Sequence, residues 1–170
     1  MHTSGRGDDA LRRHRVSLPG HSYFITICTD QRIDGLNDPA IATVIHKEIL
    51  AIKADGHWTS RSYVIMPDHL HLFVRISESL PLSRCIARLK SKTKRALQEG
   101  GLSWQGNFYE HRLRPDDSIE PVLRYLLLNP YQDNLVPSGE TYRWFWLGAE
   151  DTEWFKLTTD QGIPFPDWLR

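Results

Sequence analysis

The sequence has little of what marks a secreted or membrane-embedded protein. It contains only two cysteines among 170 residues, Cys28 and Cys85, which are too few for a disulfide framework. No apolar run approaches the roughly 20 residues that cross a bilayer, and the first residues lack the apolar segment of a signal peptide. These absences exclude a disulfide-stabilised secreted domain. They predict a cytoplasmic protein with reduced thiols and no membrane partner.

The sequence also lacks net charge, because 21 Lys and Arg residues balance 21 Asp and Glu residues. A zero balance by itself argues against a nucleic-acid partner, but the two signs are separated along the chain. Between residues 84 and 95 the chain carries cations and no acid: Arg84, Arg88, Lys90, Lys92, Lys94 and Arg95. In residues 138–170, by contrast, acids outnumber cations. The charges of the basic central run and the acidic C-terminal segment therefore cancel in the net charge, but the two segments remain regions of opposite charge.

The basic run falls on a predicted helix over residues 81–97, whose apolar stripe contains Leu82, Ile86 and Leu89. Such a face can simply be solvated, but these cations have no acids at helical spacing to pair with. Their mutual repulsion favours an anionic partner, and a phosphate backbone fits. A second basic segment, residues 1–20, is predicted to be a flexible arm whose cations include Arg12, Arg13 and Arg15. The alternative is an ordinary frayed terminus.

The pattern of apolar residues predicts four strands and three helices. The strands are predicted at residues 23–29, 58–66, 69–76 and 104–113, and the helices at residues 38–56, 81–97 and from 117 or 118 to 129–130. This order predicts an α+β fold over residues 21–137. It would be a ferredoxin-like sandwich with a small, mostly antiparallel sheet of four to five strands and helices packed on it. Residues 138–170, with four tryptophans, are predicted to be an irregular aromatic-rich tail packed on the domain.

A histidine pair opens the third predicted strand. His69 and His71 follow a turn at Pro67-Asp68 and are separated by Leu70. Residues two apart on a strand share a face, so both imidazoles leave the sheet on one side and can hold one metal ion. The alternative is one histidine on the surface and the other in the core. Spacing alone leaves both interpretations open.

Three blocks of the sequence resemble one protein family. Residues 63–72 read YVIMPDHLHL and resemble the signature of the HUH single-tyrosine nucleases, in which U is a bulky apolar residue. Within that superfamily the chain is similar to the REP-associated tyrosine transposases, relatives of the smallest insertion-sequence transposases. Residues 125–130, YLLLNP, resemble their catalytic helix, and residues 21–27, HSYFITI, resemble their first strand. The blocks occur in the expected order and span most of the chain.

The resemblance implies a metal-dependent enzyme that cleaves single-stranded DNA near a hairpin and transfers the strand. Tyr125 would be the nucleophile that forms a 5′-phosphotyrosine link, and Asn129 would join His69 and His71 as a metal ligand. The N-terminal arm, with Arg12, Arg13 and Arg15, would contact the DNA next to the hairpin. A phenol with a pKa of about 10 is mostly protonated at neutral pH, so a nearby cation or base must assist it. Two imidazoles and an amide are neutral ligands that favour Mg²⁺ or Mn²⁺ over a closed zinc site.

Several alternatives stay open from the sequence. Tyr63, Tyr109 and Tyr131 compete with Tyr125 as nucleophile. A domesticated protein on the same fold could bind DNA hairpins without turnover, although it would have no use for both histidines and Tyr125. A metal-dependent phosphodiesterase that uses water would survive the loss of Tyr125. The sequence is compatible with a monomer or a homodimer.

Overall fold

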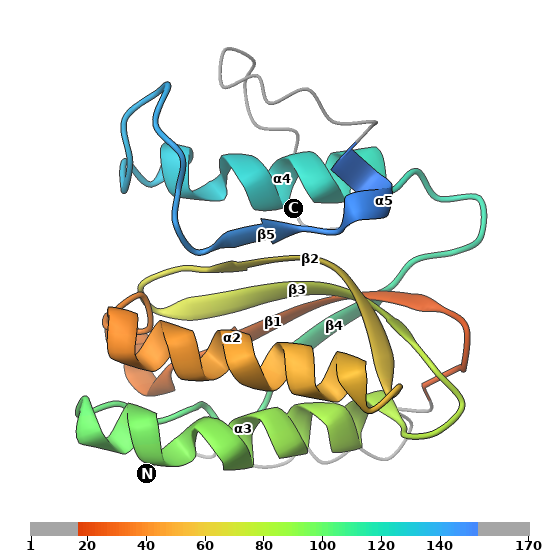
Figure 1. Cartoon of the computed structure of the whole chain (residues 1–170), viewed down its shortest axis with the longest axis horizontal. Helices are drawn as coiled ribbons and strands as arrows, with labels where there is room; N and C mark the ends of the chain where they lie inside the picture. The colour runs from red at the N-terminus through yellow and green to blue at the C-terminus, as the bar shows by residue number, and fades with distance from the viewer. Residues whose placement is uncertain (1–16, 153–170) are drawn as a thin grey trace, which may run out of the picture.

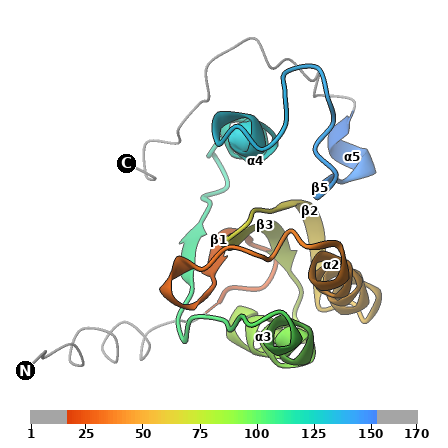
Figure 2. The same ribbon diagram turned by 90° about the vertical axis from the view of Figure 1, so that its left-hand side faces the viewer.

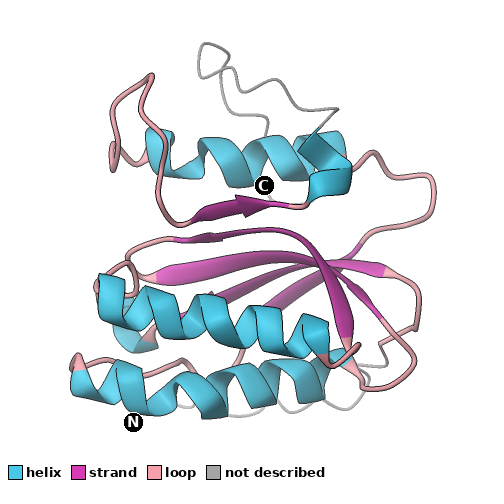
Figure 3. Cartoon of the chain, viewed as in Figure 1, coloured by secondary structure: helices cyan, strands magenta, loops and turns pink. Residues whose placement is uncertain are grey.

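The computed structural model describes residues 17–152 and shows an α+β sandwich built on one five-stranded sheet (Figures 1 and 3). The strand order is β4-β1-β3-β2-β5, and all neighbouring strands are antiparallel. In chain order the elements are β1 (Ser22–Cys28), η1 (Asp30–Arg32), α2 (Pro39–Ala54), β2 (Trp58–Ile65), β3 (His69–Ile76), α3 (Leu82–Glu99), β4 (Tyr109–Arg112), α4 (Glu120–Gln132), β5 (Phe145–Leu147) and α5 (Ala149–Thr152). The predicted α+β class is confirmed.

The sheet carries helices on both faces, as Figure 2 shows, with α2 and α3 on one side and α4 on the other. Strand alternation divides the β3 side chains between these faces. Leu70 and Leu72 belong to the core beneath α2 and α3, whereas Phe73 belongs to the core beneath α4. His69 and His71 lie four and two residues before Phe73 on the same strand, so they share its face and point toward α4. Within residues 17–152, no helix combines the length and the apolar character needed to span a bilayer.

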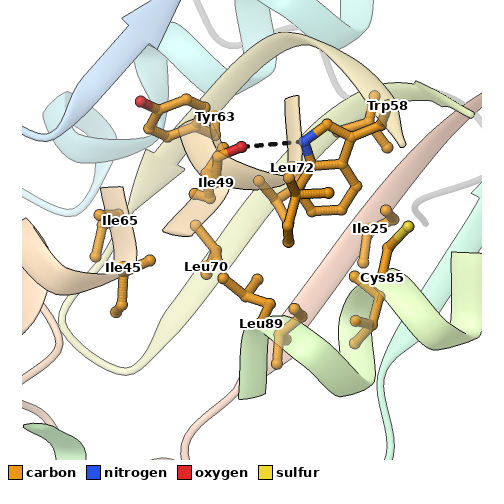
Figure 4. Close-up of a cluster of buried hydrophobic side chains, with 14 of the residues drawn as sticks. Ile25, Ile45, Ile49, Trp58, Tyr63, Ile65, Leu70, Leu72, Cys85 and Leu89 are labelled. Atoms are coloured by element: carbon orange, nitrogen blue, oxygen red, sulfur yellow. Dashed lines mark hydrogen bonds between the residues drawn. The ribbon is translucent and has the colours of Figure 1, made fainter. Parts of the chain in front are cut away.

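The larger core fixes the sheet against α2 and α3 (Figure 4). Ile45 and Ile49 of α2 and Leu89 of α3 are fully buried in it. The indole Nε1 of Trp58 donates a hydrogen bond of 3.2 Å to the carbonyl oxygen of Ile49, which ties the start of β2 to α2. This packed layer gives β3 a rigid base, so the side chains on its other face are held in fixed positions.

The predicted end of the last long helix, at Asn129-Pro130, is wrong. Helix α4 continues to Gln132 with Pro130 inside it. Proline has no backbone N–H, so Pro130 cannot donate the usual helical hydrogen bond. Because Pro130 lies in the final turn, this loss affects only the end of the helix. The chain then closes with bonds from the Asp133 N–H to the Asn129 carbonyl (3.1 Å) and from the Leu135 N–H to the Pro130 carbonyl (2.9 Å). Asn129 is therefore held in regular helix.

The predicted irregular character of the C-terminal segment is wrong for β5. This three-residue strand pairs with β2, with Trp146 opposite Tyr63, and so belongs to the same sheet as the rest. The two rings stack with centroids 5.4 Å apart, and the Lys53 ammonium of α2 lies 5.1 Å from the Trp146 ring centre. This stretch lies against β2 and α2 and not beside the basic helix α3. The remainder of the predicted tail, residues 153–170, lies outside the described part.

Truncation after Val136 is expected to yield aggregated protein. The cut removes β5, which leaves the β2 edge unpaired and uncovers the Tyr63 ring on which Trp146 stacks. A matched truncation after Thr152 keeps β5 and is expected to stay soluble. Size-exclusion chromatography of the two truncated proteins makes the comparison. A soluble monomeric protein ending at Val136 would contradict the structural role assigned to β5.

Candidate active site

The structure brings His69 and His71 together on the α4 face of β3. Their ring centroids are 4.4 Å apart and the rings lie at 72° to each other. Both side chains are buried. Burial lowers the pKa of each imidazole; for His69 the hydrogen bond to Asp68 opposes this effect, and for His71 the charges of His69 and Arg32 add to it. Both rings are therefore neutral near pH 7, which is the state that binds metal ions.

Each imidazole is oriented by an oxygen on its Nδ1 side. His69 Nδ1 lies 2.6 Å from Asp68 Oδ1, and His71 Nδ1 lies 2.8 Å from Thr26 Oγ1. When a neutral imidazole donates through Nδ1, its Nε2 carries the lone pair. This arrangement, with an outer oxygen fixing the ring and Nε2 left for another partner, is typical of metal-binding histidines.

Tyr125 reaches this pair from α4. Its hydroxyl lies 3.3 Å from His71 Nε2, and its ring packs edge-on against the rings of His71 and Phe24. Burial raises the pKa of the phenol, and the hydrogen bond from Asn129 opposes that effect. Asn129 is buried one helical turn after Tyr125, so the amide and the phenol share the α4 face that covers the histidines. The three elements β1, β3 and α4 thus converge on one site.

The competing tyrosines lie elsewhere. Tyr63 is buried on the opposite face of the sheet, where its hydroxyl hydrogen-bonds to His46 Nδ1. The Tyr131 hydroxyl donates to the Glu140 carbonyl at 2.6 Å. Tyr109 lies exposed on the edge strand β4. Among these tyrosines, only Tyr125 makes a hydrogen bond to the histidine pair.

The donor set fits a catalytic divalent cation. Within residues 17–152, no three His, Cys, Asp or Glu side chains gather closely enough to hold a metal ion by themselves. The candidate ligands are instead two imidazole nitrogens, the Asn129 amide oxygen and substrate oxygens. This set of neutral protein ligands leaves coordination positions open and does not match a four-ligand structural zinc site.

Three side chains of the site were not expected from the sequence. Asp68 was expected only as a turn residue, although its place directly before His69 is a visible signal. Thr26 and Arg32 come from β1 and the turn after it, and the strand register sets Thr26 opposite His71. Arg32 pairs with Asp68 through Nε, 2.7 Å from Oδ2. No local sequence pattern reports contacts between segments about 40 residues apart.

The basic helix α3 lies across the sheet from α4, the helix that carries Tyr125 (Figure 2). The prediction that its cations lack acidic partners is wrong for two of them. Arg88 forms ion pairs with Glu48 and Asp55, both at 2.7 Å, and Arg95 pairs with Glu99 at 2.8 Å. Glu48 lies on α2, Asp55 directly follows α2, and Glu99 lies on α3 after the last cation of the basic run.

The other α3 cations divide into two groups. The Lys90 ammonium donates to the carbonyls of Gln105 (2.7 Å) and Asn107 (2.9 Å). Arg84, Lys92 and Lys94 are exposed and form no ion pair with any residue in the described range. The predicted arm contacts, Arg12, Arg13 and Arg15, lie outside that range.

Comparisons with known proteins return one family model and several solved structures of similar fold. The family model described as "Transposase IS200 like" matches residues 17–114, a range that includes His69 and His71 and ends before α4. A solved structure of a REP-associated tyrosine transposase bound to a REP hairpin has a TM-score of 0.68 at 18% identity, over 92% of each chain. A candidate transposase from Deinococcus radiodurans has a TM-score of 0.48 at 17% identity, over 78% of this chain and 97% of that chain. No curated protein sequence matches.

Proposed function

Because the chain belongs to the IS200-like transposase family, we propose that it cleaves single-stranded DNA beside a hairpin and transfers the strand through a covalent link to Tyr125. The observation that carries this proposal is the Tyr125 hydroxyl, 3.3 Å from His71 Nε2. A nucleophile must lie next to the groups that polarise the scissile bond. One chain supplies the histidine pair and Tyr125, so a monomer contains every proposed site residue.

In the proposed reaction the Tyr125 oxygen attacks a DNA phosphorus atom. A bond forms between that oxygen and phosphorus, the bond from phosphorus to the 3′ oxygen breaks, and a 5′-phosphotyrosine results. In the overall balance the phenol proton ends on the released 3′ hydroxyl. Attack by the 3′ hydroxyl of another strand reverses these bonds and completes the transfer. Packing of the Tyr125 ring against Phe24 and His71 holds the hydroxyl in place.

The proposed ligands of a divalent cation are His69, His71 and Asn129. Mg²⁺ or Mn²⁺ bound there would supply Lewis-acid polarisation of the scissile phosphate. The chain itself orients the ligands, because Asp68 and Thr26 fix the two imidazoles through their Nδ1 atoms. The neutrality of both rings, favoured by burial, keeps their Nε2 lone pairs available.

The proposed substrate is a single strand that carries a hairpin. The hairpin-bound structure among the similar proteins supports this choice. Since α3 and Tyr125 lie on opposite faces of the sheet, we assign α3 to phosphates distant from the cleavage position. The exposed cations Arg84, Lys92 and Lys94 are the α3 side chains best placed for that contact, with the arm residues Arg12, Arg13 and Arg15 as further candidates.

A denaturing-gel assay tests the function. A labelled hairpin-bearing single strand is incubated with the protein and Mg²⁺ or Mn²⁺, with and without EDTA. We expect a protein–DNA band that survives denaturation and a released strand with a free 3′ hydroxyl, both lost with EDTA. Cleavage without the covalent band would favour a water-using phosphodiesterase. Binding without cleavage would favour a hairpin-binding protein without turnover.

The double variant Lys92→Gln/Lys94→Gln is expected to weaken DNA binding without lowering stability. Each lost phosphate contact on duplex DNA reduces the slope of log K against log salt by about 0.9, so the hairpin slope should fall by about 1 to 2. Lys90→Gln is the matched variant: it breaks the bonds to Gln105 and Asn107 and should lose about 1 kcal/mol of stability. Salt titrations and thermal unfolding measure both effects. An unchanged slope in the double variant would mean that this face is only solvated surface.

A further inference from the structure

The turn after β1 places a guanidinium group beside the histidine pair. Arg32 Nε lies 2.7 Å from Asp68 Oδ2, and Asp68 Oδ1 in turn lies 2.6 Å from His69 Nδ1. Arg32 also donates through Nη1 to the sulfur of Cys28, at 2.7 Å. Cys28 is the β1 residue opposite His69 in the strand register. The guanidinium is therefore fixed at the end of the sheet where His69 lies.

The backbone of this turn is unusual. Gln31 and Arg32 both have positive φ angles, 53° and 57°, in the left-handed region that non-glycine residues rarely occupy. Two consecutive residues of this kind cost free energy that the surroundings must offset. The turn is secured to the Pro67-Asp68 turn, because Thr29 donates through its N–H and Oγ1 to the Asp68 carbonyl (2.9 and 3.0 Å). The strained backbone and the histidine turn thus form one unit.

The hydrogen-bonding capacity of Arg32 is only partly used. A guanidinium has five N–H donors, and residues of the described range accept from Nε and Nη1 alone. The side chain is 50% exposed. Through Asp68 the guanidinium is only one side chain removed from His69. A half-exposed guanidinium in this place can receive an anion.

We propose that Arg32 binds a non-bridging oxygen of the phosphodiester that Tyr125 attacks. This inference rests on the proposed function and adds a substrate-binding residue that comes from the turn after β1. The pair with Asp68 fixes the planar group, and the free N–H donors hold the phosphate oxygen as its charge grows in the transition state. The competing role is purely structural: Arg32 would hold Asp68, and Asp68 would hold His69.

A binding experiment tests the contact without requiring cleavage. In a Tyr125→Phe background, Arg32→Gln is expected to weaken binding of the hairpin-bearing strand and to reduce the salt slope by about 0.7, the value for one single-strand phosphate contact. Arg75→Gln is the matched control, because Arg75 is an exposed arginine near the opposite end of β3 from His69. It should leave the slope unchanged. An unchanged slope for Arg32→Gln would overturn the proposal, whether or not the wild-type protein cleaves DNA.

A rate experiment separates the two roles of Arg32. On a normal phosphodiester, Arg32→Gln should slow covalent adduct formation by about 10²- to 10³-fold, the usual loss for one transition-state donor. With a methylphosphonate at the cleavage position, which lacks one charged oxygen, the same substitution should cost far less. Arg32→Lys should recover part of the rate, because it keeps the charge but loses the fork geometry. Equal losses on both linkages would overturn the proposal. If the wild-type protein forms no adduct, the proposed function fails, while the salt slope still decides on Arg32.

Discussion

Replacing Tyr125 by phenylalanine is expected to abolish covalent attachment to DNA and to leave the fold and DNA binding intact. Phenylalanine keeps the ring contacts with Phe24 and His71 and removes only the hydroxyl. The lost hydrogen bonds should cost about 1 kcal/mol of stability, which a folded domain tolerates. Adduct formation on denaturing gels, DNA affinity and thermal unfolding of the variant provide the three measurements.

Two other tyrosines serve as controls for this result. Tyr131→Phe removes the hydroxyl that donates to Glu140, and Tyr109→Phe removes an exposed hydroxyl on the edge strand β4. Both variants should form the adduct at rates close to wild type. Persistent adduct in the Tyr125 variant would contradict its assignment as nucleophile. Cleavage that persists without adduct would identify water as the attacking group.

His69→Ala and His71→Ala should each reduce cleavage by more than about 10²-fold and remove its dependence on divalent cations. Each substitution deletes one of only two imidazole ligands proposed for the ion. Asp68→Asn is expected to have a smaller effect, about 10- to 100-fold, because Asp68 acts on His69 from outside the ligand set. Cleavage rates across a Mn²⁺ titration, together with calorimetric Mn²⁺ binding, would measure this graded series.

The control for the histidine variants is His57→Ala. His57 hydrogen-bonds to Ser79 near the opposite end of the sheet from His69, so its loss should not change the Mn²⁺ dependence. Near wild-type cleavage by either His69→Ala or His71→Ala would show that the pair is not the metal site. Equal loss in all three histidine variants would indicate general destabilisation.

The alternation of strand side chains is a local property, which is why the shared face of His69 and His71 could be predicted from the sequence. Residues four apart on a helix share a face, so the common face of Tyr125 and Asn129 is likewise a local property of the sequence. The end of α4 was predicted wrongly, because a proline in a final turn breaks fewer bonds than one in the middle of a helix. Strand β5 was missed because three consecutive apolar residues show no alternation, and its pairing with β2 decides its conformation.

The outer contacts of the candidate site depend on segments that are distant in the chain. Thr26 meets His71, and Arg32 meets Asp68, only because β1 pairs with β3 in one particular register. The ion pairs of Arg88 with Glu48 and Asp55 similarly require α2 and α3 to pack side by side. Sequence patterns identify a helix or strand and its apolar and polar faces, but they do not show which helix or strand packs against each face.

Peptide mapping of the DNA adduct shows which residue of the protein becomes attached to DNA. The protein is incubated with a hairpin-bearing single strand and Mg²⁺ or Mn²⁺, digested with protease and nuclease, and analysed by mass spectrometry. We expect one modified peptide, with a 5′-phosphonucleotide attached to Tyr125 and to no other tyrosine. A nucleotide on a different tyrosine, or cleaved DNA with no modified peptide, would contradict it.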